Sequence, residues 1–103
     1  MVYPKVSILW VNCNSEKIIN VVLESIYTIL NLNYPNYEVI IVDNGSTDKS
    51  FDKIKQVIES HVSSDIRIKV IKLDRNMGFN TANNIAFQAR DKDSRYVVLL
   101  NND

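Results

Sequence analysis

Four short runs of apolar residues divide the chain, and a segment with helical periodicity separates each run from the next. Residues 6–11, 39–42 and 96–100 are largely or wholly apolar, which is typical of strands that are covered on both faces of a parallel sheet. The run from 66 to 73 instead alternates apolar residues with basic ones. That alternation predicts an edge strand with a charged face.

Three intervening segments space their apolar residues three or four positions apart, as helices that pack against a sheet do. They cover residues 18–30, 51–62 and about 81–90. The third carries small alanine side chains on its apolar face, which predicts a close approach of this helix to the sheet. Asn14 or Ser15 is expected to cap the first helix.

The order of elements is therefore β-α-β-α-β-α-β, with no repeat and no internal linker. Right-handed crossovers place the first two helices on one face of the sheet. If the fourth strand returns beside the first, the third helix covers the other face and the strand order is 3-2-1-4. We expect one α/β domain over residues 1–103, Rossmann-like, with three α/β/α layers and a mainly parallel four-stranded sheet. Ligands bind at the switch point of such sheets, outside the carboxyl ends of the strands.

Each predicted strand runs into a polar cluster at its carboxyl end. The clusters are residues 12–14, 43–46, 74–78 and 101–103. In a parallel sheet all four clusters share one edge and could line a single cleft. Such residues also make turns and helix caps, and this alternative stays open for each cluster taken alone.

Two carboxylates in these clusters suggest chemistry. Asp43 presents an acceptor at the end of a buried strand, suited to the imide N–H of a base such as uracil or thymine. Asp103 could hold Mg²⁺ or Mn²⁺ when the phosphates of a substrate supply most of the other oxygens.

Composition narrows the partners and the compartment. Twelve Lys and Arg residues balance twelve Asp and Glu residues among 103, so charge gives no reason to expect nucleic acid or an anionic membrane as partner. The single cysteine, Cys13, excludes an internal disulfide, and we expect it to be a buried thiol rather than a nucleophile. No apolar run reaches the roughly 18 residues of a transmembrane segment. We expect a cytoplasmic chain, membrane-associated if the full-length protein carries an anchor.

Four motifs, in this order, resemble the nucleotide-binding half of family 2 glycosyltransferases with the GT-A fold. Residues 6–15 resemble the opening strand and Tyr-Asn turn of that family, with Cys13 where an aromatic residue is usual. Residues 42–48 resemble its Val-Asp-Asp/Asn-Gly-Ser-x-Asp signature, and residues 76–84 its Asn-x-Gly-Phe-x-x-Ala-x-Asn segment. Residues 99–103 resemble its Asp-x-Asp metal motif in an Asn-x-Asp form. A rhamnosyltransferase-like subgroup is one candidate within the family.

This resemblance implies a binding site for a UDP- or dTDP-linked sugar. Its nucleotide-binding residues would be Val11, Asn12, Cys13, Asn14, Glu16, Asp43, Asn44, Arg75, Asn76, Gly78 and Asn84. Asp43 would accept a hydrogen bond from the base N3–H, and Glu16 would lie near the ribose or base. Arg75 and Asn76 would face the base or the diphosphate, with Gly78 permitting close backbone approach.

The resemblance also implies a divalent cofactor, Mg²⁺ or Mn²⁺. Asp103 would be its ligand and Asn101 a weaker contributor. A metal that bridges the diphosphate offsets the negative charge that develops on the departing nucleoside diphosphate.

The implied protein is the N-terminal, nucleotide-sugar-binding part of an enzyme of polysaccharide biosynthesis. Transfer by direct displacement needs a base that removes the proton of the acceptor hydroxyl, and no carboxylate in the sequence matches that base. We therefore expect a domain truncated after the metal motif, which binds a sugar nucleotide without transferring sugar on its own.

The sequence leaves one alternative function open, argues against another class of domain and predicts self-association. A non-catalytic structural or interaction fragment with a degenerate cleft is the alternative function. A response-regulator-like domain shares the βα pattern, but it needs an acidic pair after the first strand, where this chain has residues 12–14. The free edge of the fourth strand predicts self-association into a homo-oligomer.

Overall fold

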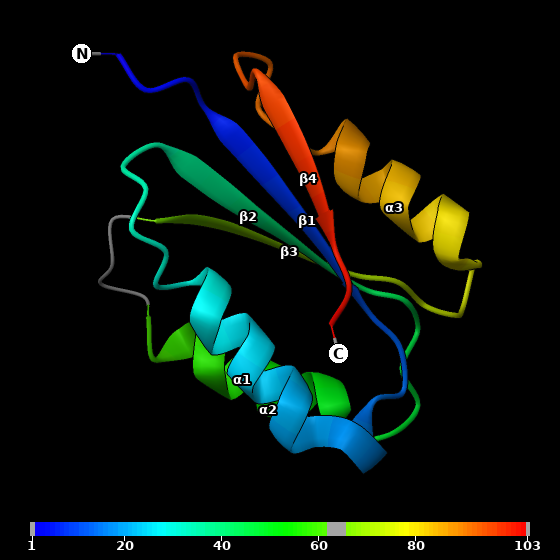
Figure 1. Cartoon of the computed structure of the whole chain (residues 1–103). Coiled ribbons are helices and arrows are strands. Elements are labelled where there is room, and N and C mark those ends of the chain that lie inside the picture. The colour runs from blue at the N-terminus through cyan, green and yellow to red at the C-terminus, as the bar shows by residue number, and fades with distance from the viewer. Residues whose placement is uncertain (1, 62–65, 103) are drawn as a thin grey trace.

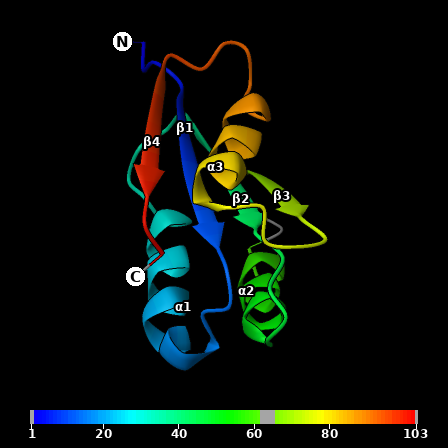
Figure 2. The same ribbon diagram turned by 90° about the vertical axis from the view of Figure 1, so that its right-hand side faces the viewer.

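The computed structural model describes residues 2–61 and 66–102. Its elements are β1 (Val6–Asn12), the 3₁₀ helix η1 (Glu16–Ile18), α1 (Ile19–Ile29), β2 (Tyr37–Asp43), α2 (Ser50–Glu59), β3 (Arg67–Lys72), α3 (Phe79–Gln88) and β4 (Tyr96–Leu100). The strands form one parallel sheet in the order β3-β2-β1-β4. Helices α1 and α2 cover one face and α3 covers the other (Figures 1 and 2). The predicted three-layer architecture and strand order are confirmed.

The sheet separates two apolar cores, because successive side chains of a strand point to opposite faces. The larger core, under α1 and α2, contains Ile8, Trp10, Val22, Ile26, Ile29, Leu30, Tyr37, Val39, Ile41 and Ile54. The smaller core, under α3, contains Leu9, Ile40, Val42, Ala82 and Ala86. Both alanines are fully buried and α3 packs against β1 and β2, as its small side chains predicted.

Strand β4 lies at a free edge of the sheet, as predicted, but its faces are more exposed than its apolar run indicated. Its apolar run indicated a strand covered on both faces, yet Tyr96 is 61% exposed and Leu99 is 63% exposed. Among the described strands, β4 pairs with β1 alone and forms one edge of the sheet. The opposite edge is the basic strand β3, as predicted. An apolar run reports β propensity, but its position in the sheet depends on which neighbours the chain supplies.

Helix boundaries also differ from prediction by a few residues. Neither expected cap holds the first helix, because Ser15 Oγ donates to Asn12 and Asn14 Oδ1 accepts from the backbone of the β2–α2 loop. Ile18, expected on the buried stripe, is exposed in η1. Helix α2 ends at Glu59, and Ser60 and His61, predicted to continue it, form a turn; residue 62 lies outside the described residues. No helix in residues 2–61 and 66–102 is long and apolar enough to cross a bilayer.

A charged network closes the amino ends of the strands. Glu38 of β2 is fully buried and accepts hydrogen bonds from Ser7 Oγ at 2.6 Å and from the backbone N–H of Asp91 at 2.7 Å. Lys69 Nζ lies 3.0 Å from Glu38 Oε1 and 2.8 Å from Asp91 Oδ1, and Lys5 also pairs with Asp91. These contacts attach the connection between α3 and β4 to the sheet, and so they orient β4.

The network shifts the pKa values of its carboxyl groups downward. Burial would raise the pKa of Glu38, but hydrogen bonds from Ser7, the Asp91 N–H and Lys69 outweigh it and lower that pKa. Hydrogen bonds from Lys5 and then Lys69 hold the pKa of Asp91 well below its usual range.

We predict that this network makes the fold sensitive to acid. A carboxyl group with a lowered folded-state pKa stabilises the fold above its unfolded-state pKa, about 4, and this stabilisation is lost as the pH falls below that value. The urea midpoint should therefore fall between pH 7 and pH 3, and Asp91→Asn should lower it at pH 7 and flatten its pH dependence. Asp52→Asn, at an exposed position of α2, is the control. An unchanged pH dependence in Asp91→Asn would contradict the assignment.

Candidate functional site

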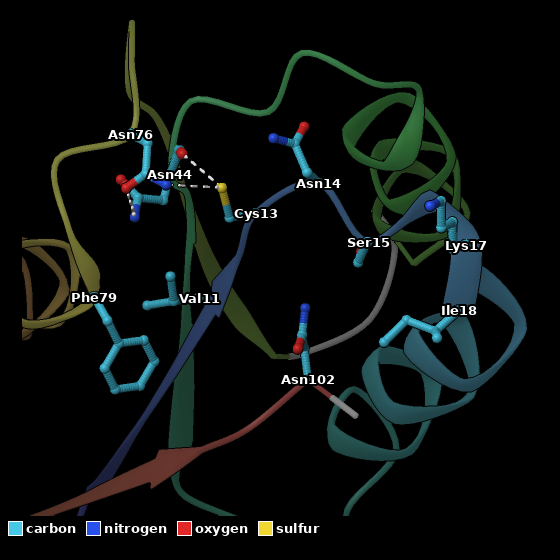
Figure 3. A pocket seen from close by; sticks show the side chains of 10 residues that line it. All are labelled: Val11, Cys13, Asn14, Ser15, Lys17, Ile18, Asn44, Asn76, Phe79 and Asn102. Atoms are coloured by element: carbon cyan, nitrogen blue, oxygen red, sulfur yellow. Dashed lines mark hydrogen bonds between the residues drawn. The ribbon is translucent and has the colours of Figure 1, made fainter.

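The carboxyl ends of the strands form a cavity of about 480 Å³. We call it the main cavity, because residues that follow all four strands line it. Its lining residues are Val11, Cys13, Asn14, Ser15, Lys17, Ile18, Asn44, Asn76, Phe79 and Asn102 (Figure 3). They come from the ends of β1 and β2, the β3–α3 loop, the start of α3, η1 and the segment after β4. The volume is in the range of small-molecule sites. The prediction that polar clusters after different strands meet in one cleft is confirmed for the described residues.

Two asparagine side chains shape one wall of the cavity. Asn44 is buried, and its Nδ2 donates to Asn76 Oδ1 at 3.1 Å and to the carbonyl of Gly78 at 3.3 Å. Asn44 Oδ1 accepts from the Met77 N–H at 2.9 Å. Asn76 Nδ2 has only a long contact, 3.5 Å, with Cys13 Sγ. The β3–α3 loop is thus fixed to the end of β2, while one amide donor remains weakly engaged at the cavity.

Gly45 brings these two loops together. It has a φ of +69°, and a Cβ at this position would lie 2.1 Å from the carbonyl carbon of Arg75. Gly78 also has a positive φ, +88°, but a Cβ there would meet no atom within 4 Å. The backbone conformation therefore favours glycine at both positions, and close contact within the chain requires it only at Gly45.

Asp43 and Asn12 form a buried polar layer beneath the cavity. Asp43 Oδ1 accepts from Asn12 Nδ2 at 3.0 Å and from Ser46 Oγ at 2.7 Å. Its Oδ2 accepts from the Ser46 N–H at 3.0 Å and from Lys72 Nζ at 3.2 Å. Asn12 Oδ1 accepts from Asn102 Nδ2 at 2.9 Å, which links this layer to the end of β4. Asp43 is fully buried and does not line the cavity, so its contact with a base stays a prediction.

The thiol of Cys13 lies between the walls of the cavity. Sγ donates to the carbonyl of Asn44 at 3.2 Å, and the residue is partly buried. Burial, reinforced by the negative charges of Asp43 and Asp48, raises the pKa of the thiol. The group is therefore protonated at neutral pH, in agreement with the expectation that it is not a nucleophile.

Several predicted site residues lie away from the main cavity. Glu16 borders an adjacent hollow and lies 3.9 Å from Lys53, and Arg75 and Asn84 are exposed and do not line the main cavity. Asn101 lines a separate cavity between α1 and β4, with Val21, Glu24, Ser25, Thr28, Ile29 and Leu100.

Five lining residues were not predicted: Ser15, Lys17, Ile18, Phe79 and Asn102. Asn102 lay within a recognised polar cluster, but the sequence could not show that it, rather than Asn101, faces this cavity. Phe79 and Lys17 directly follow the predicted residues Gly78 and Glu16. Neither was predicted, because the predictions favoured polar turn residues.

The metal prediction rests on Asp103. Asp103 lies outside the described residues. In residues 2–61 and 66–102, no group of three or more His, Cys, Asp or Glu side chains is placed to hold a metal ion. Of the described residues that follow β4, Asn102 lines the main cavity and Asn101 lines a separate one, and both side chains are neutral amides.

Residues 7–103 match the sequence profile of the family described as Glycosyl transferase family 2. The chain belongs to this family. It is 34% identical over 100 residues to an uncharacterized glycosyltransferase of Haemophilus influenzae. It is 31% identical over 100 residues to the putative teichuronic acid biosynthesis glycosyltransferase TuaG of Bacillus subtilis. Each alignment covers 97% of this chain and 36% of the relative, so the chain spans about a third of the length of these relatives.

Solved protein structures share the fold. S. aureus TarS 1–349, in complex with UDP, superposes with a TM-score of 0.71 at 27% identity, over 96% of this chain and 27% of that one. The mannosyltransferase PcManGT from Pyrobaculum calidifontis, in complex with GDP-Man and Mn²⁺, gives a TM-score of 0.70 at 25% identity, over 87% of this chain and 25% of that one. The family 2 sheet and helices of this chain are thus of the GT-A type.

We predict that Asp43 is essential to the stability of this glycosyltransferase domain. Asp43→Asn replaces one acceptor oxygen with an N–H₂ group that faces donors, so the free energy of unfolding should fall by about 2–4 kcal/mol. Urea denaturation measures the change. Asp74→Asn, at an exposed carboxylate just after β3, should change stability by less than about 0.5 kcal/mol. Equal stability of the two variants would show that the buried contacts of Asp43 contribute little.

A second prediction separates the two glycines. Gly78→Ala forces a residue with a Cβ into a positive-φ conformation and should lower stability by about 1–3 kcal/mol. Gly45→Ala adds overlap with the Arg75 backbone and should lower stability further. Thermal or urea unfolding of both variants gives the comparison. The contact argument fails if Gly45→Ala is the milder substitution.

Proposed function

We propose that this chain is the nucleotide-sugar-binding part of a family 2 glycosyltransferase and that the cavity in Figure 3 receives a UDP- or dTDP-linked sugar. The observation that carries the proposal is the cavity itself, at the carboxyl ends of parallel strands, with amide side chains from four different segments and the aromatic Phe79 in its lining. TarS with UDP and PcManGT with GDP-Man support a nucleoside diphosphate as the ligand class.

The amide wall suits the edge of a pyrimidine base. Asn76 Nδ2, held only by the long contact with Cys13 Sγ, can donate to a base carbonyl oxygen. Asp43 is a less direct acceptor for the imide N–H, because four donors already fill roughly the four acceptor directions of a carboxylate. Of these donors, Lys72 has a half-exposed side chain and is the one that a base could displace most readily.

A divalent cation, Mg²⁺ or Mn²⁺, completes the proposal. Asp103 would hold it, with Asn101 as a weaker contributor, and PcManGT contains Mn²⁺ together with GDP-Man. When bound, the cation would act as a Lewis acid that offsets charge on the diphosphate. The amides of the described residues would orient the nucleotide beside it.

The wider assignments stay predictions. They are transfer of sugar to an acceptor in polysaccharide biosynthesis, a rhamnosyltransferase-like specificity, and self-association through β4. The exposed apolar side chains of β4 favour one alternative function, a structural or interaction domain whose cleft binds no nucleotide. That alternative makes the opposite prediction about nucleotide binding.

We predict that UDP and dTDP bind, and that Mn²⁺ strengthens the binding. Titration calorimetry with each nucleotide, in the presence and absence of Mn²⁺, measures both effects. Asp103→Ala should remove the metal effect and leave metal-free binding unchanged. Asp43→Ala is a poor probe of base recognition, because unfolding would also abolish binding.

Alkylation of Cys13 gives an independent readout, since it is the one cysteine of the chain. The raised pKa predicts slow alkylation at neutral pH that accelerates toward alkaline pH, because only the thiolate reacts. Bound UDP should protect the thiol, which mass spectrometry would detect, and free ribose is the matched control. If no nucleotide gives a heat of binding in calorimetry and none protects Cys13 from alkylation, the results support the interaction-domain alternative.

A further inference from the structure

Lys17 is the one charged side chain among the ten described residues that line the main cavity. It belongs to η1, directly before α1, and it is exposed. In Figure 3, Lys17 and Ile18 lie across the cavity from Phe79 and Asn76. The cavity therefore has an aromatic and amide side and, opposite it, a cationic side.

Three carboxylates near this end of the sheet, Asp43, Asp48 and Glu16, already have partners. Asp43 accepts four hydrogen bonds, one of them from Lys72. Asp48 accepts from Ser50 and from the backbone N–H of Glu16, and Glu16 itself lies 3.9 Å from Lys53. Glu16 and Asp48 do border the adjacent hollow that Lys17 also borders.

Lys17 differs from its charged neighbours. Within residues 2–61 and 66–102 it forms no ion pair at 4 Å or less. The chain as a whole has no net charge, so it exerts no strong long-range attraction on an anion. The electrostatic preference of the cavity thus depends on local charge, and Lys17 supplies that charge.

We infer that Lys17 contacts the phosphate groups of the nucleotide and makes affinity depend on their number. The inference rests on the proposed function. A base against the Phe79 and Asn76 side leaves the anionic part of the ligand directed toward Lys17. An ammonium group forms charge-assisted hydrogen bonds with phosphate oxygens and acts as a point charge without demanding a fixed bidentate geometry. Because Lys17 is exposed, salt screens this attraction.

The test compares uridine, UMP and UDP, in EDTA so that no metal supplies the positive charge. Chemical-shift titrations by NMR detect weak binding in a chain of 11.9 kDa. Affinity for the unaltered chain should rise from uridine to UDP. Lys17→Gln should weaken UDP binding roughly tenfold, weaken UMP binding less, and leave uridine binding unchanged. It should also reduce the salt dependence of UDP binding.

Two further variants exclude general effects. Lys17→Arg keeps the positive charge and should keep the preference for UDP. Lys55→Gln removes an exposed lysine of α2 that lines none of the described cavities near the site, and it should behave as the unaltered chain does.

The outcomes separate this inference from the proposed function. If the unaltered chain binds UDP and Lys17→Gln keeps the same ratio of UDP to uridine affinity, Lys17 is not the phosphate contact and the proposed function stands. If Lys17→Gln weakens all three ligands equally, the side chain only shapes the cavity and the inference is wrong. If no ligand shifts any signal of the unaltered chain, the proposed function fails and the inference fails with it.

Discussion

One buried hydrogen bond joins the strands at the carboxyl end of the sheet, where the cavity lies. Asn12 and Asp43 are register partners at the ends of β1 and β2, and Asn12 Nδ2 donates to Asp43 Oδ1 at 3.0 Å. Around this pair gather Ser46 of the β2–α2 loop, Lys72 of β3 and Asn102 beyond β4. Because both side chains are fully buried, any unpaired polar atom there would be expensive. The pair thus holds the loops that form the cavity in one arrangement.

Buried polar groups at the two ends of the sheet are satisfied by different kinds of partner. At the amino ends, the buried carboxylate of Glu38 is satisfied by Lys69, by the Ser7 hydroxyl and by a backbone N–H of the α3–β4 connection. At the carboxyl ends, amides and hydroxyls replace most of the charges. Charged partners bind each other firmly and leave little capacity for a ligand, whereas weakly engaged amides such as Asn76 can exchange partners.

The two edges of the sheet also differ. Strand β3 presents basic side chains, which oppose pairing with another strand, while β4 presents apolar side chains and no charge. The family relatives are about three times as long as this chain. The solved structures superpose on it over 16% to 27% of their own length. In the described residues, β4 is exposed and the main cavity lies at its carboxyl end.

The sequence by itself determined the elements and the edge at which the polar clusters meet, and it favoured the strand order that the structure shows. Apolar periodicity is local, and right-handed crossovers leave few ways to connect such elements. Only the tertiary structure decided which polar residues are accessible. Asp43 and Asn12 carry the residue types expected of ligand contacts, but the folded chain uses them internally, while Lys17 and Phe79 line the cavity. The exposure of a side chain at the end of a strand depends on the loops packed over it, and those contacts join residues 30 to 90 positions apart, which no local pattern records.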